Sequence, residues 1–141
     1  MAVTGPAPYK FGVFTAHIDA VSNSAASAYL IGSATGGPTL PGAQGGKIAK
    51  LSVDCNVTDD TSGTSLTVTV YKDAFNAANE VMQVVITLDG TGDEQGTSTT
   101  VIDAGKDIFA ADSELIVAVT SAGTTYAVAD VNVAVEYAVN Y

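Results

Sequence analysis

The stretch DVNVAVEYAV, residues 130–139, alternates without a break between two kinds of side chain. One set consists of Val131, Val133, Val135, Tyr137 and Val139. The other set consists of Asp130, Asn132, Ala134, Glu136 and Ala138. Because successive side chains of a β-strand point to opposite faces, this period of two places the first set in a core and the second toward solvent. The stretch therefore predicts a half-buried strand.

The same period recurs upstream, which predicts an all-β protein. Further strands are expected in KLSVDCNV (50–57), SLTVTVYK (65–72), VMQVVITL (81–88) and ELIVAV (114–119). Segments rich in Gly, Asn, Asp and Ser separate them, and these residues favour turns because they adopt positive φ or bond their own backbone. Short strands that return after polar turns are typical of an antiparallel β-sandwich.

The first 46 residues differ in composition from the rest. PAPYKFGVFTAHIDAV (6–21) alternates loosely, SAYLIG (27–32) predicts a short strand, and SATGGPTLPGAQGG (33–46) is rich in Gly and Pro. We therefore expect one domain with two regions. Residues 1–46 form an extended N-terminal arm, the first strands and a Gly/Pro-rich linker, and residues 47–141 form the sandwich core.

Three aromatic residues of the first region are candidate interface residues: Tyr9, Phe11 and Phe14. Exposed aromatic side chains on an arm need a surface to cover them, either on the same chain or on a neighbouring subunit. The prolines of this region resist compact packing, so we expect the arm to dock on a neighbour. Deleting residues 1–12 should then weaken attachment and leave the sandwich folded.

Charge and composition exclude several functions. The chain has 15 acidic residues against five lysines and a net charge of −10, and it has no arginine. Such a surface repels nucleic-acid phosphates and anionic membranes, so we expect neither as a partner. MAVTGPAPYK lacks the basic start and apolar run of a signal peptide, and no apolar run approaches the ~20 residues of a membrane span. We expect a protein made in the cytoplasm.

Local chemistry has few candidates. A nucleophile would have to use Cys55 with His17, the only residues of their types, but Cys55 is in phase with the core-facing residues of its strand. A glycosidase pair is not identifiable, since the adjacent Asp59 and Asp60 point apart on extended backbone. We therefore expect no catalytic residue, no metal and no cofactor.

The stretch TLDGTGDEQGTSTT (87–100) resembles a calcium or phosphate loop in composition alone. Asp89, Asp93 and Glu94 do not have calcium-loop spacing, and no Gly-Lys-Ser/Thr opens a helix. We interpret the stretch as a solvated turn bent at Gly90 and Gly92, followed by a strand at STTVI (98–102).

The spacing of these elements resembles a known group of modules. The segments that carry this resemblance are GKIAKLSV, GTSLTVTVYKD, VVITL, DIFAADSELIVAVTSAGTT and ADVNVAVEYAV. The order and spacing of the strands resemble those of β-sandwich modules in tailed-bacteriophage virions, such as capsid decoration (cement) proteins and head fibres. The resemblance covers roughly residues 47 to 139. The sequence differs from these modules in two respects. Ala111-Asp112 stands where Gly-Asp is expected, and the Gly/Pro-rich N-terminal region has no counterpart in them.

The resemblance implies a jelly-roll-like sandwich with a structural role on the capsid surface. It implies a homotrimer whose partner is the major capsid protein. The alternative is a glycan- or receptor-binding phage fibre module, which would gather Tyr, Asn and Asp side chains at one end of the sandwich.

Overall fold

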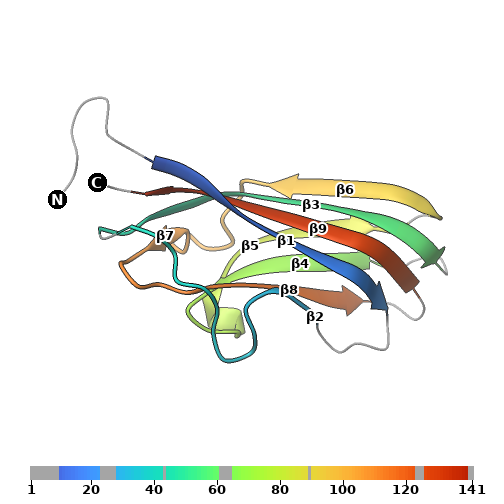
Figure 1. Ribbon diagram of the computed structural model, residues 1–141, viewed down its shortest axis with the longest axis horizontal. Coiled ribbons are helices and arrows are strands. Elements are labelled where there is room, and N and C mark those ends of the chain that lie inside the picture. The colour runs from blue at the N-terminus through green and yellow to red at the C-terminus, as the bar shows by residue number, and fades with distance from the viewer. Residues whose placement is uncertain are drawn as a thin grey trace.

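The computed structural model describes residues 10–22, 28–42, 44–60, 65–88, 90–122 and 126–139. The strands in these ranges are β1 (Lys10–Ser22), β2 (Ala28–Ile31), β3 (Gly46–Asp60), β4 (Ser65–Lys72), β5 (Glu80–Thr87), β6 (Gly92–Ser98), β7 (Ile108–Phe109), β8 (Leu115–Ala122) and β9 (Tyr126–Val139). A 3-10 turn, η1 (Ala77–Asn79), precedes β5 (Figure 1). No helix in the described ranges has the length and apolar character needed to cross a bilayer.

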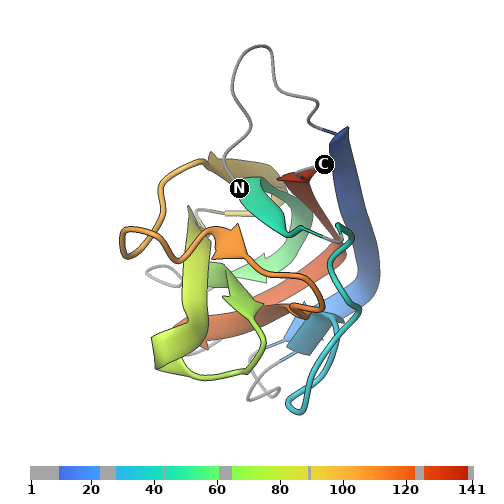
Figure 2. The same ribbon diagram turned by 90° about the vertical axis from the view of Figure 1, so that its left-hand side faces the viewer.

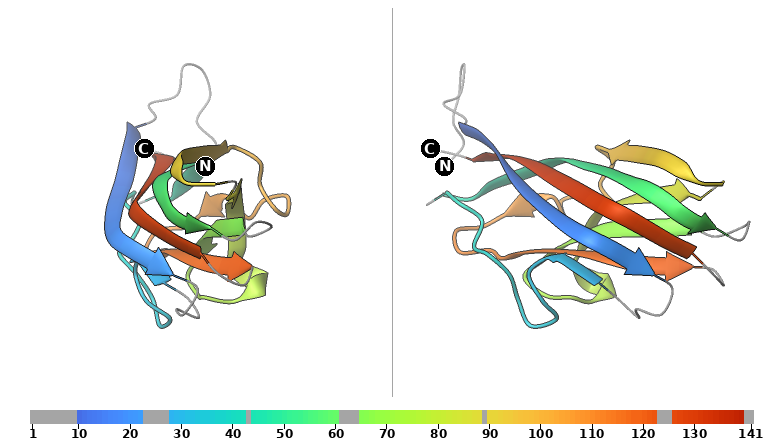
Figure 3. Two further views of the ribbon diagram at one scale, coloured as in Figure 1. Left: turned by 90° about the vertical axis from the view of Figure 1, so that its right-hand side faces the viewer. Right: turned by 45° about the vertical axis from the view of Figure 1, so that its right-hand side comes forward.

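The strands form two antiparallel sheets that face each other (Figures 2 and 3). The first sheet has the order β1-β9-β3-β6, with β7 also paired to β3, and the second has the order β2-β8-β4-β5. The pairs are nested: β1 joins β9, β2 joins β8, β3 joins β6 and β4 joins β5. This is a long antiparallel ribbon rolled into two layers, the jelly-roll arrangement. The expected all-β antiparallel sandwich is confirmed.

The core lies between the sheets and is built from the inward-facing sets of the alternating strands. In β9 the side chains of Val131, Val133 and Val135 are buried, as the alternation predicts. Tyr137 continues the phase but is only half-buried. Its ring occupies the space over Gly12, where an added Cβ would lie 2.3 Å from the tyrosine oxygen. The ring also packs on Phe14, with 5.5 Å between the ring centroids.

The first region of the chain contributes directly to both sheets. β1 pairs with β9 along its length and β2 pairs with β8. Tyr9 and the rest of residues 1–9 lie outside the described residues. Residues 10–12 belong to β1, so the expected deletion of residues 1–12 would remove part of a sheet strand. A deletion that tests the arm therefore has to end at residue 9.

The Gly/Pro-rich segment has irregular backbone but is hydrogen-bonded to the chain at the start of β8. The side chain of Leu40 is buried, and its backbone N–H donates to the carbonyl of Ser113 over 2.7 Å. The N–H of Leu115 donates to the carbonyl of Pro38 over 2.9 Å. Gly37 lies so close to this contact that an added Cβ would sit 1.8 Å from the Leu115 carbonyl oxygen, so only glycine fits there.

The expectation for residues 92–102 was wrong. GDEQGTS (92–98) is the edge strand β6, paired with β3, whereas residues 99–102 form no strand. The expected bend lies at Gly90, before β6, and at Gly92, the first residue of β6, with φ of 83° and 134°. An edge strand needs only backbone pairing on one side, so turn-forming side chains do not prevent it. Gly96 lets β6 approach the second sheet, since an added Cβ would lie 2.6 Å from Val84 Cγ1.

Burial predicts where truncation destabilises the fold. Leu51 is fully buried between the sheets, so Leu51→Ala should lower the free energy of unfolding by about 2–5 kcal/mol through lost transfer energy and a cavity. Val85 is 55% exposed on β5, so Val85→Ala should change it by less than about 0.5 kcal/mol. Urea unfolding followed by circular dichroism measures both. Equal losses in the two variants would contradict the assigned core.

Candidate functional site

The outer face of the first sheet presents rows of side chains that cross its strands. The register aligns Phe11, Ala138, Lys47 and Ile108 in the first row. The second row contains Val13, Glu136 and Lys50, and the third contains Thr15, Ala134, Ser52 and Thr97. The fourth contains His17, Asn132, Asp54 and Gln95. We call these four rows the outer face.

The outer face changes character from one end to the other. Phe11 is 80% exposed and Ile108 is 53% exposed, so the first row is apolar apart from Lys47. The third row carries only small side chains. Beyond the fourth row lie Asp19, Asp93 and Asp130, so that end of the face is acidic.

A hydrogen-bonded chain of polar side chains crosses the sheet in the fourth row. Nδ1 of His17 lies 2.7 Å from Asn132 Oδ1, and Asn132 Nδ2 donates to Asp54 Oδ1 over 2.9 Å. Asn132 Nδ2 also donates to the carbonyl of Asp130 over 3.1 Å. Both of these acceptors are oxygens, which fixes the amide orientation so that Oδ1 faces the imidazole.

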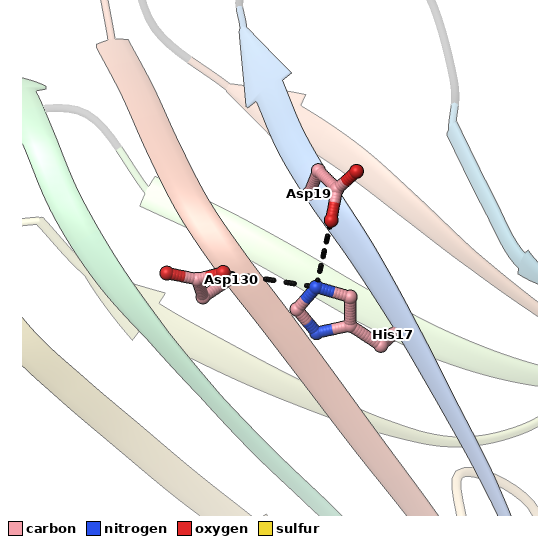
Figure 4. Close-up of side chains that lie close together, drawn as sticks. All are labelled: His17, Asp19 and Asp130. Atoms are coloured by element: carbon pink, nitrogen blue, oxygen red, sulfur yellow. Dashed lines mark hydrogen bonds and ion pairs between the residues drawn. The ribbon is translucent and has the colours of Figure 1, made fainter.

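The imidazole of His17 has acceptors beside both of its nitrogens. Figure 4 shows the two of them that lie near Nε2, Asp19 and Asp130. Its Nε2 lies 3.0 Å from Asp19 Oδ1 and 3.7 Å from Asp130 Oδ1. The hydrogen bonds to Asn132 and Asp19, together with the charges of Asp19 and Asp130, raise the pKa of His17 above its ordinary value. An imidazolium donates from both nitrogens, so this geometry favours the protonated form.

The same group is the place where a cation could meet several ligands. His17, Asp19 and Asp130 each offer an atom within 4.8 Å of the others, and all three are exposed. Exposed carboxylates beside an imidazole also occur as ion pairs and hydrogen bonds without any metal. The short contacts here join the side chains to one another. Asp93 projects from the same face but lies on β6, two strands away from β9, and Glu94 points to the other face, so neither joins this group.

Cys55 and His17, the nucleophile and base considered from the sequence, do not lie together. Cys55 points into the core, whereas His17 projects from the outer face. Burial, followed by the nearby charges of Glu94 and Asp54, raises the pKa of the Cys55 thiol to about 11. A thiol with that pKa is not a nucleophile at neutral pH, because the thiolate is the reactive species.

Of the three predicted interface residues, the structure exposes Phe11 on the outer face, while Phe14 points inward against Tyr137. Phe11 borders a hollow of about 580 Å³ whose walls include Ile108, Val101 and the buried carboxylate of Asp107. Lys47 Nζ lies 3.4 Å from Asp107 Oδ2 at its edge.

Sequence reasoning missed an aromatic cluster at the second sheet. The rings of Tyr71 and Phe75 lie 4.8 Å apart between centroids, and Tyr29 lies 5.3 Å from Phe75. Tyr71 is buried, so the cluster is largely a small core of its own. It lies on a different sheet from the Asp and Asn side chains of the fourth row.

Comparisons with known proteins show a shared fold. No protein-family model matches the chain, and no curated protein matches it in sequence. A structure of infectious bursal disease virus, Gx strain, matches with a TM-score of 0.52 at 12% identity. That match covers 99% of this chain but 38% of the viral chain. The chain thus spans well under half of the viral protein, and the likeness concerns the fold.

Two weaker matches have TM-scores below 0.5. FLHE gives 0.44 at 16% identity, over 90% of this chain and 96% of that chain. A capsid asymmetric unit of cyanophage Pam1 gives 0.42 at 14% identity, over 99% of this chain and 92% of that chain.

The His17 network predicts a pH-dependent stability. Because the pKa of His17 is raised in the folded state, protonated His17 adds to the free energy of unfolding. This stabilisation is fully present below the ordinary pKa of 6.5 and is lost as pH rises through the folded-state pKa. NMR titration of the single imidazole should give a pKa above that of the urea-unfolded chain. Asn132→Ala should lower it, whereas Gln95→Ala, in the same row, should not. Equal pKa values in the folded and unfolded chain would contradict the network.

Cys55 predicts a thiol protected by folding. With a pKa of about 11 and a buried side chain, the thiol should react with a disulfide reagent at pH 8 at least about a hundredfold more slowly in the native protein than in the unfolded chain. Absorbance of the released thiol measures both rates. Comparable rates would place Cys55 outside the core.

Proposed function

We propose that this protein is a virion structural protein, specifically a capsid decoration protein that binds the shell of a tailed-phage head and stabilises it. Its partner would be the major capsid protein, its location the capsid surface, and its assembly a homotrimer. The observation that carries the proposal is the nested jelly-roll sandwich of this chain, together with the fold match of 99% of the chain to the infectious bursal disease virus structure.

The distribution of side chains supports binding rather than catalysis. The candidate nucleophile and its base lie on opposite sides of the first sheet, and the polar network is exposed rather than enclosed. What the outer face offers is a broad surface with apolar side chains at one end. Exposed aromatic and aliphatic side chains grouped in this way mark protein–protein contact surfaces.

The alternative, a glycan- or receptor-binding fibre module, predicts aromatic and polar side chains at one place. The Asp and Asn side chains of the fourth row instead belong to the first sheet, and the Tyr71 cluster belongs to the second. A sugar ring stacked on that cluster would therefore not reach the network, which disfavours this alternative.

The test is binding to emptied phage heads. Purified protein mixed with heads should sediment with them at a fixed stoichiometry, and the decorated heads should disassemble at a higher temperature than bare heads. Removing residues 1–9, which precede β1, should reduce binding without lowering the unfolding midpoint. The matched control replaces these nine residues with a Gly/Ser segment of the same length.

Absence of co-sedimentation would contradict the decoration proposal, and specific retention on a glycan array would then favour the fibre module. Equal binding by the full chain and by the chain lacking residues 1–9 would remove the proposed role of the arm.

A further inference from the structure

We propose that the outer face of the first sheet binds a second copy of this chain, face to face, across a two-fold axis that runs parallel to the strands between β9 and β3. The proposal concerns the purified protein in solution, whereas the homotrimer proposed above is its assembly on the capsid, so it does not depend on capsid binding.

Two side chains of opposite charge lie near the middle of the outer face. Lys50 on β3 and Glu136 on β9 are register partners in the second row, and neither forms an ion pair with any residue that the structure describes. The other lysine of the face, Lys47, is already engaged with Asp107. Lys50 and Glu136 are therefore available to a partner.

A two-fold axis between these strands makes the face complementary to itself. Rotation about the axis places β9 of one copy over β3 of the other and preserves the position along the strands. Glu136 then faces Lys50 of the second copy, and the same contact repeats on the other side of the axis. A two-fold interface always repeats its contacts in this way.

Neighbouring rows match under the same rotation. Ala134 meets Ser52 of the second copy, so small side chains let the sheets approach closely. Asn132 meets Asp54 of the second copy, so polar side chains face polar side chains in the fourth row. In the first row, the exposed ring of Phe11 meets Ile108, which removes two exposed apolar side chains from water. Aligned sheets cross at about 30°, so the match is closest in the rows nearest the axis.

The area of the face is sufficient for a weak dimer. Four strands about 4.8 Å apart and eight residues at about 3.4 Å each give a patch on the order of 500 Å² per copy. The total of about 1,000 Å² is at the lower end of specific interfaces. The acidic ends beyond the fourth row meet each other and reduce the affinity, because like charges that face each other cost binding energy. We therefore expect dissociation in the micromolar range.

Charge reversal tests the central contact. Sedimentation equilibrium of the full chain should show the mass rising from 14.2 kDa toward twice that value with concentration. Lys50→Glu and Glu136→Lys should each weaken association at least about tenfold, because each places two like-charge pairs at the axis. The double variant should restore it. Lys106→Glu, which makes the same charge change in the loop before β7, should not alter the mass.

A second variant tests the close approach without touching the charged pair. Ala134→Lys puts a long side chain at the axis and should leave a monomer, whereas Val85→Lys on the second sheet should leave the dimer intact. Circular dichroism confirms folding of each variant.

A wild-type monomer throughout the micromolar range would overturn the proposal, and so would a trimer insensitive to Lys50→Glu. A folded double variant that fails to dimerise would also overturn it. Binding to phage heads is read in a separate experiment, so the failure of either proposal is visible on its own.

Discussion

The double pairing of β9 is the constraint on which the rest of the structure depends. This strand is hydrogen-bonded to β1 on one edge and to β3 on the other, so its backbone groups have no free side. Its inward set is buried against the second sheet, and a slip of one residue would turn that set to solvent. Val128 and Val131 both face inward although they are three residues apart. Asp130, with φ of 51°, lies where the register with β3 shifts and absorbs the extra residue.

The outer face follows from the same constraint. Once the valines of β9 are fixed inward, its other set must project outward and align with β1 and β3 into rows. The rows bring together His17, Asn132 and Asp54, and also Glu136 and Lys50. The fold is similar to that of the infectious bursal disease virus structure at 12% identity, whereas these rows depend on the side chains of this chain.

Most of the strands could be predicted from the sequence, because burial of one sheet face leaves a period of two. β6 could not, since GDEQGTS has turn-forming residues and pairs through its backbone at an edge. The polar network was equally inaccessible. His17 and Asn132 are 115 residues apart, and Asn132 and Asp54 are 78 residues apart. Which residues of distant strands lie side by side depends on the register, and the register is set by bulges and by close packing at glycines such as Gly37 and Gly96.

The nested pairing also has a consequence for biosynthesis. β1 is made before β9, its partner along the whole length, so β1 stays without that partner until residues 126–139 have been translated. At about 5–20 residues per second, Lys10 waits on the order of ten seconds for Val139. During that time β1 is an unpaired strand whose inward-facing Phe14 and Ile18 have no complete core to pack against. Pairing that spans nearly the whole chain is slow, so the nascent polypeptide is most vulnerable to misassociation, and most dependent on chaperones, just before β9 emerges.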